Sequence, residues 1–174
     1  MASFATSYIP TTSAQVTRNV DLASMTNFGS WYNQAQGSFY AESDNIYNNA
    51  GNSFIYELWN NTISVTYSEG ILYVSNGTVY LTGGATANIN GGLISAGSTN
   101  KYISSVSQGG NAVFAVNGVV KGTISSNLRT STPDTVYIGA DRNSGYLSML
   151  NGHIRKITYY PQALSSANLV ALTS

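Results

Sequence analysis

The sequence has no cysteine and little charge. Without cysteine, the chain has no disulfide, no thiolate metal site and no cysteine nucleophile. Charged residues make up 8% of the chain, whereas an average protein has about 25%. The formal net charge is zero and the seven Lys and Arg residues are scattered, although a phosphate backbone attracts clustered cations. We therefore expect no nucleic-acid partner.

Long apolar runs are also missing. No stretch reaches the length of about 18 apolar residues that a membrane-spanning helix needs. The first residues, Met1-Ala-Ser-Phe-Ala-Thr-Ser7, lack the charged start and apolar core of a signal peptide. We expect a soluble domain with no membrane insertion and no export signal of its own.

What the sequence does have is Ser, Thr, Asn and Gly in large number, together with 13 tyrosines. Thr and Tyr suit a half-solvated strand, and Gly and Asn suit turns. A chain of 174 residues fits one domain and buries roughly 70% of its unfolded surface. The composition predicts an all-β protein.

Short runs of alternating apolar and polar residues recur along the chain, each bounded by Gly, Asn or Ser. Their length and spacing are typical of a β-sandwich or barrel. The predicted strands cover 37–42, 53–59, 62–67, 71–74, 78–81, 101–106, 112–121, 134–139 and 153–160. Between residues 83 and 99 large apolar residues are scarce, so we expect a long irregular connection holding one short strand at most.

The turns and the C-terminal end carry more specific signals. Asn117-Gly118 between two apolar runs predicts a type I′ hairpin. In the last strand the apolar positions change phase between Ile154 and Ile157, which predicts a one-residue bulge near Arg155-Lys156. Pro161 should end that strand, and a short helix should follow the Ser165 cap.

Three segments together resemble a known superfamily: Val113-Phe-Ala-Val-Asn-Gly-Val-Val120, Val136-Tyr-Ile-Gly-Ala-Asp141, and Leu150-Asn-Gly-His-Ile-Arg-Lys-Ile-Thr-Tyr-Tyr-Pro-Gln-Ala-Leu-Ser165. They are similar to the concanavalin A-like lectin/glucanase superfamily, in its laminin G-like branch. Ala5-Thr-Ser-Tyr-Ile-Pro-Thr-Thr12 and the His153 to Pro161 ending resemble domains of bacteriophage tail and virion proteins. The middle of the chain matches only in the rhythm of its strands.

The resemblance implies a fold and a setting. It implies a two-sheet antiparallel jelly-roll sandwich with a short C-terminal helix. Residues 1–12 would be a linker from a possible upstream domain, and residues 13–174 a single sandwich. The setting would be the extracellular face of a virion.

Catalytic residues are hard to find in this sequence. His153 is the only histidine, and no serine elbow accompanies it, so we interpret it as a structural residue of the last strand. Retaining glycanases of the superfamily carry a Glu-x-Asp-x-x-Glu strand with paired carboxylates, but Glu42-Ser-Asp44-Asn-Ile-Tyr47 ends in tyrosine. A hydrolase using Glu42 or Glu57, or pairing Glu57 with Glu69 across strands, is the less favoured alternative.

A calcium site is the candidate metal site. Laminin G-like relatives bind calcium through Asp, Asn and carbonyl oxygens at the sandwich rim. Asp134, Asp141 and Asn143 are the candidate ligands, with Asp21 and Asp44 as alternatives. Ordinary turn capping is the competing interpretation of these residues.

Aromatic and amide side chains are the candidates for sugar binding, because sugars stack on aromatic rings while amides and acids bind their hydroxyls. The two densest patches give as candidate ligand-binding residues Trp31, Tyr32, Tyr56, Glu57, Trp59 and Asn61. Strand alternation should put Tyr56 and Leu58 on one face and Ile55, Glu57 and Trp59 on the other, partly solvated face. Alternatively, both tryptophans are anchors of the core.

We therefore expect a non-catalytic carbohydrate-binding or adhesive module of a bacteriophage virion protein, such as a tail fibre or receptor-binding component. Its partners would be a host cell-surface glycan or other virion proteins. The alternative is a purely structural decoration or oligomerisation domain, a homo-oligomer that would be a trimer in a tail fibre.

Overall fold

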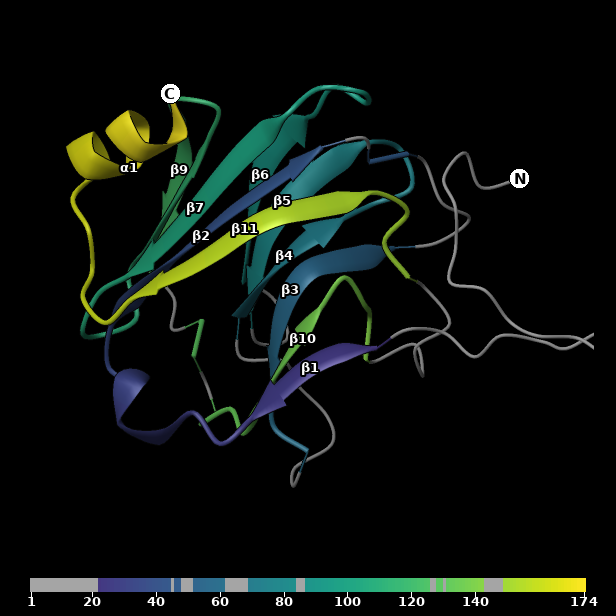
Figure 1. Cartoon of the computed structure of the whole chain (residues 1–174). Coiled ribbons are helices and arrows are strands. Elements are labelled where there is room, and N and C mark those ends of the chain that lie inside the picture. The colour runs from purple at the N-terminus through teal and green to yellow at the C-terminus, as the bar shows by residue number, and fades with distance from the viewer. Residues whose placement is uncertain are drawn as a thin grey trace, which may run out of the picture.

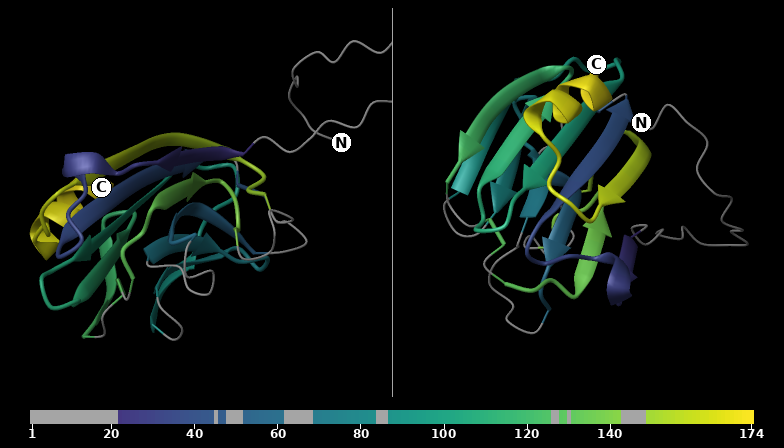
Figure 2. Two further views of the ribbon diagram at one scale, coloured as in Figure 1. Left: turned by 90° about the horizontal axis from the view of Figure 1, so that it is seen from below. Right: turned by 90° about the vertical axis from the view of Figure 1, so that its left-hand side faces the viewer.

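The structure is a computed structural model that describes residues 22–44, 46–47, 52–61, 69–83, 87–125, 128–129, 131–142 and 149–174. Over these ranges the chain forms two antiparallel sheets stacked face to face, with one short helix on the outside (Figure 1, Figure 2). Within them, no helix is long and apolar enough to cross a membrane. The all-β sandwich expected from the composition is confirmed.

The six-stranded sheet, sheet A, has the order β1-β10-β3-β4-β5-β6, and the five-stranded sheet, sheet B, has the order β11-β2-β7-β8-β9. All neighbouring strands are antiparallel. The elements are β1 (Ala23–Thr26), η1 (Gly29–Trp31), β2 (Gly37–Asp44), β3 (Ser53–Trp59), β4 (Glu69–Tyr73), β5 (Thr78–Gly83), β6 (Ala87–Leu93), β7 (Asn100–Val106), β8 (Ala112–Val116), β9 (Val119–Ile124), β10 (Thr135–Ile138), β11 (His153–Tyr160) and α1 (Ser166–Thr173).

Most predicted strands are present, with two corrections. The stretch from 83 to 99 is not mainly irregular, because it contains β6, a strand of seven residues. The four-residue strand β1 was not predicted at all. The predicted strand 62–67, the linker 1–12 and the candidate ligands Asp21 and Asn143 lie outside the described residues.

The core lies between the two sheets and is rich in aromatic rings. Phe39 of sheet B stacks on Tyr56 of sheet A, with ring centroids 4.8 Å apart. Phe114, Leu81 and Tyr102 are also fully buried. Tyr56 points into this core, as does Leu58, so alternation along β3 is confirmed for these two residues. Ile55 departs from the expectation: it is the extra residue of a bulge and belongs to the core cluster.

A buried carboxylate, Glu69, links the two sheets inside the core. Its Oε1 accepts hydrogen bonds from the hydroxyls of Tyr56 on β3, at 2.9 Å, and of Ser104 on β7. Its Oε2 accepts a charged hydrogen bond from Arg129 Nε at 2.8 Å. A buried carboxylate is costly unless it is paired and hydrogen-bonded. The network connects β3 and β4 of sheet A to β7 of sheet B and satisfies both oxygens of the carboxylate.

The C-terminal segment closes the sandwich as predicted. The register of β11 against β2 shifts between Ile154 and Lys156, which makes Arg155 the extra residue of the bulge. β11 ends at Tyr160, and Ser165 caps α1 by accepting a hydrogen bond from the backbone N–H of Asn168.

Helix α1 packs on the outer face of sheet B, which Figure 1 shows near β7 and β9. Leu169 is buried there against Tyr40, Ile103 and Ala115. Asn117 and Gly118 have φ angles of +49° and +76°, as a type I′ turn requires. The backbone N–H of Gly118 donates to Thr173 Oγ1 at 3.1 Å, so the hairpin also holds the end of the helix.

Candidate functional site

The outer face of sheet A, turned away from sheet B, carries hydroxyl, amide and aromatic side chains. Directly opposed residues of antiparallel strands share one face, so the registers trace rows across the sheet. One row crosses all six strands and consists of Ser24, Tyr137, Glu57, Gly70, Thr82 and Asn88. A second row is Phe54, Leu72, Tyr80 and Asn90, and a third is Thr26, Thr135 and Trp59. We call these rows the sheet A outer face.

The part of this face nearest the β6 edge is the accessible one, and we call it the open half, although Thr82 and Phe54 of the same rows are buried. Asn88 and Asn90 of β6 are exposed, and Tyr80 and Leu72 beside them are half-buried. Asn90 Oδ1 accepts a hydrogen bond from the Gly92 backbone N–H at 2.7 Å, which fixes the orientation of that amide. The open half therefore combines a phenol ring with two exposed amides, the groups that recognise sugar rings and hydroxyls.

The other half of the face is covered. Glu57 and Trp59 are 0% and 2% exposed, so the expectation of a partly solvated surface there was wrong. Arg142 is part of the cover: its backbone N–H donates to Glu57 Oε2 at 3.0 Å, and its guanidinium carbon lies 5.9 Å from the centre of the Trp59 ring. A segment far away in the sequence thus crosses the face at β3.

Burial changes the charge of Glu57. Loss of solvent raises the pKa of its carboxyl from 4.5 to about 8, and the nearby Asp141 charge adds to this rise. The hydrogen bond from the Arg142 backbone and the Arg142 charge act in the opposite direction without cancelling it. Glu57 is consequently protonated at neutral pH. It is the only carboxyl in the three rows, so the charge nearest to them is that of Arg142 and Asp141, which lie beside Glu57.

Asn61 and Asp134, predicted as a ligand-binding and a metal-ligating residue, bind each other. Asp134 Oδ2 accepts from the Asn61 backbone N–H at 3.0 Å, and Oδ1 accepts from Asn61 Nδ2 at 2.8 Å. The hydroxyl of Thr135 also donates to Asp134 Oδ1 at 2.7 Å. These bonds clamp the end of β3 to the start of β10. Among the described residues, no group of three or more His, Cys, Asp or Glu side chains could hold a metal ion.

Trp31 and Tyr32 lie elsewhere, at the side of the sandwich where η1 meets β11. Trp31 is 37% exposed and rests edge-on against Tyr159, with centroids 5.3 Å apart. Tyr32 is packed between Phe28 and Tyr159 at 5.0 and 5.6 Å, and burial raises its pKa. Of the two tryptophans, one is therefore partly accessible and the other is buried. Tyr56, also a candidate, is fully buried in the core.

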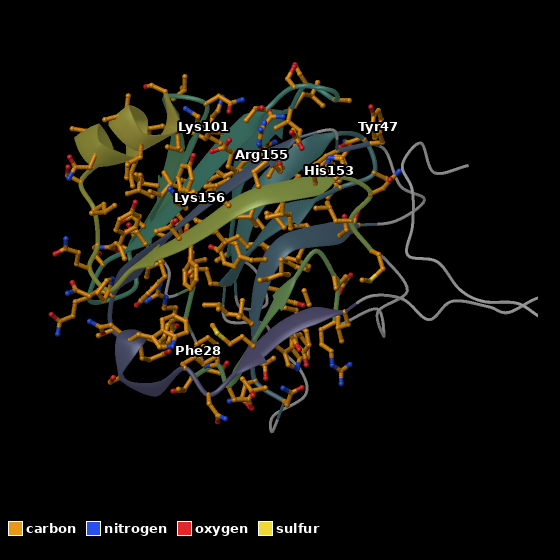
Figure 3. The ribbon with its side chains drawn as sticks, viewed as in Figure 1. Phe28, Tyr47, Lys101, His153, Arg155 and Lys156 are labelled. Atoms are coloured by element: carbon orange, nitrogen blue, oxygen red, sulfur yellow. The ribbon has the colours of Figure 1, made fainter. Side chains whose placement is uncertain are left out.

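The outer face of sheet B is different in kind. Helix α1 covers one part of it, and charged side chains of β2, β7 and β11 lie on another part. Figure 3 labels Lys101, His153, Arg155 and Lys156 over β7 and β11. Arg155 Nε lies 3.8 Å from Glu42 Oε1, and its Nη1 lies 3.1 Å from Asp44 Oδ2. His153 Nδ1 is 3.4 Å from Asp44 Oδ1. His153 thus belongs to a surface ion-pair network on the last strand.

The carboxylate pairs that a glycan hydrolase would need are not formed. Glu42 lies on the outer face of sheet B, opposite Lys156 and Lys101. Glu57 lies on the outer face of sheet A, and Glu69 lies in the core between the two sheets. Glu57 and Glu69 lie on opposite faces of sheet A, so the predicted pairing of these two acids across strands is wrong. Glu42 lies in a third layer, away from both.

Comparison with known proteins gives no match by sequence: neither a family model nor a curated protein matches this chain. Solved structures do match it by shape. The Ruminococcus gnavus IT-sialidase CBM40 bound to α2,3-sialyllactose gives a TM-score of 0.67 at 16% identity, over 80% of this chain and 83% of that chain. A heptameric SAP-like pentraxin from Limulus polyphemus gives 0.59 at 18% identity, over 80% and 70%.

The chain has the β-sandwich fold of these proteins. Trypanosoma rangeli sialidase also matches, with a TM-score of 0.66 at 17% identity, but the match covers 22% of that chain. At these identities the likeness is one of fold alone.

Tyr80, Asn88 and Asn90 were not among the predicted ligand-binding residues. The signal was present, because Ala87-Asn-Ile-Asn-Gly91 alternates between buried and exposed positions as a half-solvated strand does. Without large apolar side chains it did not stand out as a strand, and its exposed amides could not be assigned to a face.

Proposed function

We propose that this chain is a non-catalytic carbohydrate-binding module whose ligand lies on the sheet A outer face. The observation that carries the proposal is the open half of this face, where the half-buried ring of Tyr80 lies beside the exposed amides of Asn88 and Asn90. The shared fold with a CBM40 that binds sialyllactose supports it.

The open half of the face can bind a sugar in a simple way. Tyr80 offers a ring for contact with the apolar face of a sugar. The exposed amide of Asn88 offers both donors and an acceptor to sugar hydroxyls. The rigid sheet holds these groups in place before the ligand arrives, which lowers the entropy cost of binding.

Glycan arrays and then titration calorimetry on the identified glycan would test this proposal. Tyr80→Ala and Asn88→Ala should each weaken binding by about tenfold, the equivalent of one lost contact of about 1.4 kcal/mol. Lys156→Ala, on the outer face of sheet B, is the matched control and should bind as the parent chain does. The proposal fails if the folded chain binds no glycan, or if Lys156→Ala weakens binding while Asn88→Ala does not. Release of reducing sugar would contradict the non-catalytic part.

The sequence motifs near the two ends of the chain suggest the biological setting in which the module works. We propose that the chain is a laminin G-like domain of a bacteriophage virion protein and that its partner is a host cell-surface glycan. The support is the resemblance of residues 5–12 and 153–161 to virion domains. Mass spectrometry of purified particles of a phage that encodes the chain would detect it there, and its absence from the particle would refute this setting.

A further inference from the structure

The four edges of the two sheets differ in how they are protected. An edge strand exposes unpaired backbone N–H and C=O groups, which can pair with a strand of another molecule. Proteins usually block this with charges, proline, bulges, very short strands or a covering element. Three of the four edges of this sandwich carry a charge, a bulge or both.

β11 carries Arg155 and Lys156 together with a bulge. β9 carries Lys121 and a register shift against β8. β6 contains Gly91 and Gly92 and has a register shift against β5. The edges formed by β6 and β9 also approach each other closely, since a methyl group added at Gly122 would lie 2.8 Å from Ile89.

β1 is the exception, since its only protection is its length of four residues. Ala23-Ser-Met-Thr26 has no charge and no proline, and it pairs with β10 without a register shift. All four residues are exposed, including Met25 at 45%, and the adjacent Leu22 is 41% exposed. Within the described part of the chain, no strand pairs with the far side of β1.

We propose that β1 is the edge through which two copies of this chain pair, antiparallel, into a dimer. The open backbone groups call for a strand as the occupant, and a second β1 is complementary to the first because antiparallel pairing of identical strands is symmetric. No charge on residues 22–26 opposes this approach.

The dimer would join the two six-stranded sheets into one continuous sheet. The two-fold axis of such a pair is perpendicular to the sheet. The outer faces of the two copies of sheet A therefore lie on the same side of the dimer. The Tyr80 and Asn88 positions lie on β5 and β6, remote from β1 in the strand order, so dimerisation leaves them open. Two glycan faces on one side would raise the avidity for a repetitive glycan surface. This last step depends on the proposed function; the dimer itself does not.

Analytical ultracentrifugation of the full chain, from dilute to concentrated solution, tests the dimer. The mass should rise from 18.4 kDa towards twice that value. Met25→Lys should remain a monomer throughout. Val119→Lys, a matched change at an exposed apolar residue of the β9 edge, should dimerise as the parent chain does. A parent chain that stays monomeric, or a Met25→Lys chain that dimerises equally, overturns the proposal.

Cysteine cross-linking gives a second readout that does not depend on a loss of association. Because the chain has no cysteine, Ser24→Cys introduces a single thiol beside the proposed contact. It should form an intermolecular disulfide under mild oxidation, whereas Val119→Cys should not. Equal cross-linking of both variants would contradict pairing through β1. Glycan binding by the Met25→Lys monomer, measured in the same preparation, separates failure of the dimer from failure of the proposed function.

Discussion

Glu57 should make the stability of this protein depend on pH in an unusual direction. Its carboxyl ionises with a pKa near 4.5 when it is exposed to water and near 8 in the folded chain. Between these values the folded state holds a proton that the unfolded state has released. Stability contributed by this group is therefore complete below pH 4.5 and is lost as the pH rises through 8.

The size of the effect follows from the two pKa values. Their difference, 8 minus 4.5, is about 3.5, and each pKa unit corresponds to about 1.36 kcal/mol. The free energy of unfolding should therefore fall by about 5 kcal/mol between pH 4.5 and a pH above 8. That is a large share of the roughly 5–15 kcal/mol typical of a folded domain.

Urea unfolding followed by tryptophan fluorescence, repeated from pH 5 to pH 9, measures this dependence. Glu57→Gln keeps the size of the side chain and cannot ionise, so its profile should be flatter. It should be more stable than the parent chain by several kcal/mol at pH 9 and close to it at pH 5. Added salt should change little, because buried groups are weakly screened. A stability difference between the two proteins that is the same at pH 5 and pH 9 would refute the reasoning.

Three further substitutions test other parts of the structure. Glu69→Gln leaves the buried Arg129 without its counter-charge, so urea unfolding should show a loss of about 3–5 kcal/mol; a loss below about 1 kcal/mol would contradict the role of Glu69 in linking the sheets. Gly118→Ala places a side chain at φ +76° and within 3.2 Å of Ser174 Oγ, and should cost about 1–2 kcal/mol in thermal unfolding; an unchanged Tm would argue against the type I′ turn. Asp134→Ala removes the hydrogen bonds to Asn61 and should lower the Tm by the same amount in calcium and in a chelator. If calcium raises the Tm of the parent chain but not that of Asp134→Ala, Asp134 belongs to a calcium site.

Regular strand patterns were predictable because they are local. The boundaries of β3 and β11 were predicted correctly, since each has alternating residues and clear turn residues at its ends. The bulge at Arg155 was visible as a change of phase in the apolar positions of one strand. Such features depend on neighbours in the chain alone.

The candidate site was harder to predict because its exposure depends on distant segments. Arg142 lies over Trp59, and no residue near Trp59 in the sequence predicts this contact. β6 was predicted only as one short strand at most, because its inner positions are small. Gly91 shows the reason: a methyl group there would lie 2.6 Å from Phe114 and 2.8 Å from Val79. Close packing against sheet B leaves room only for glycine at that position. Because glycine is not an apolar strand former, the segment lacks the residue pattern by which a strand is predicted from sequence.

The row that runs from Ser24 to Asn88 takes one residue from each strand of sheet A. Adjacent strands are about 4.8 Å apart, so the row is about 24 Å long. The middle of the row, from Tyr137 to Thr82, is buried. A ligand on the open half would therefore contact side chains from three neighbouring strands, β4, β5 and β6, namely Leu72, Tyr80, Asn88 and Asn90. A substitution in one strand would then change one ligand contact and leave the others intact. Ligand preference could therefore change one contact at a time while the sandwich itself stays the same.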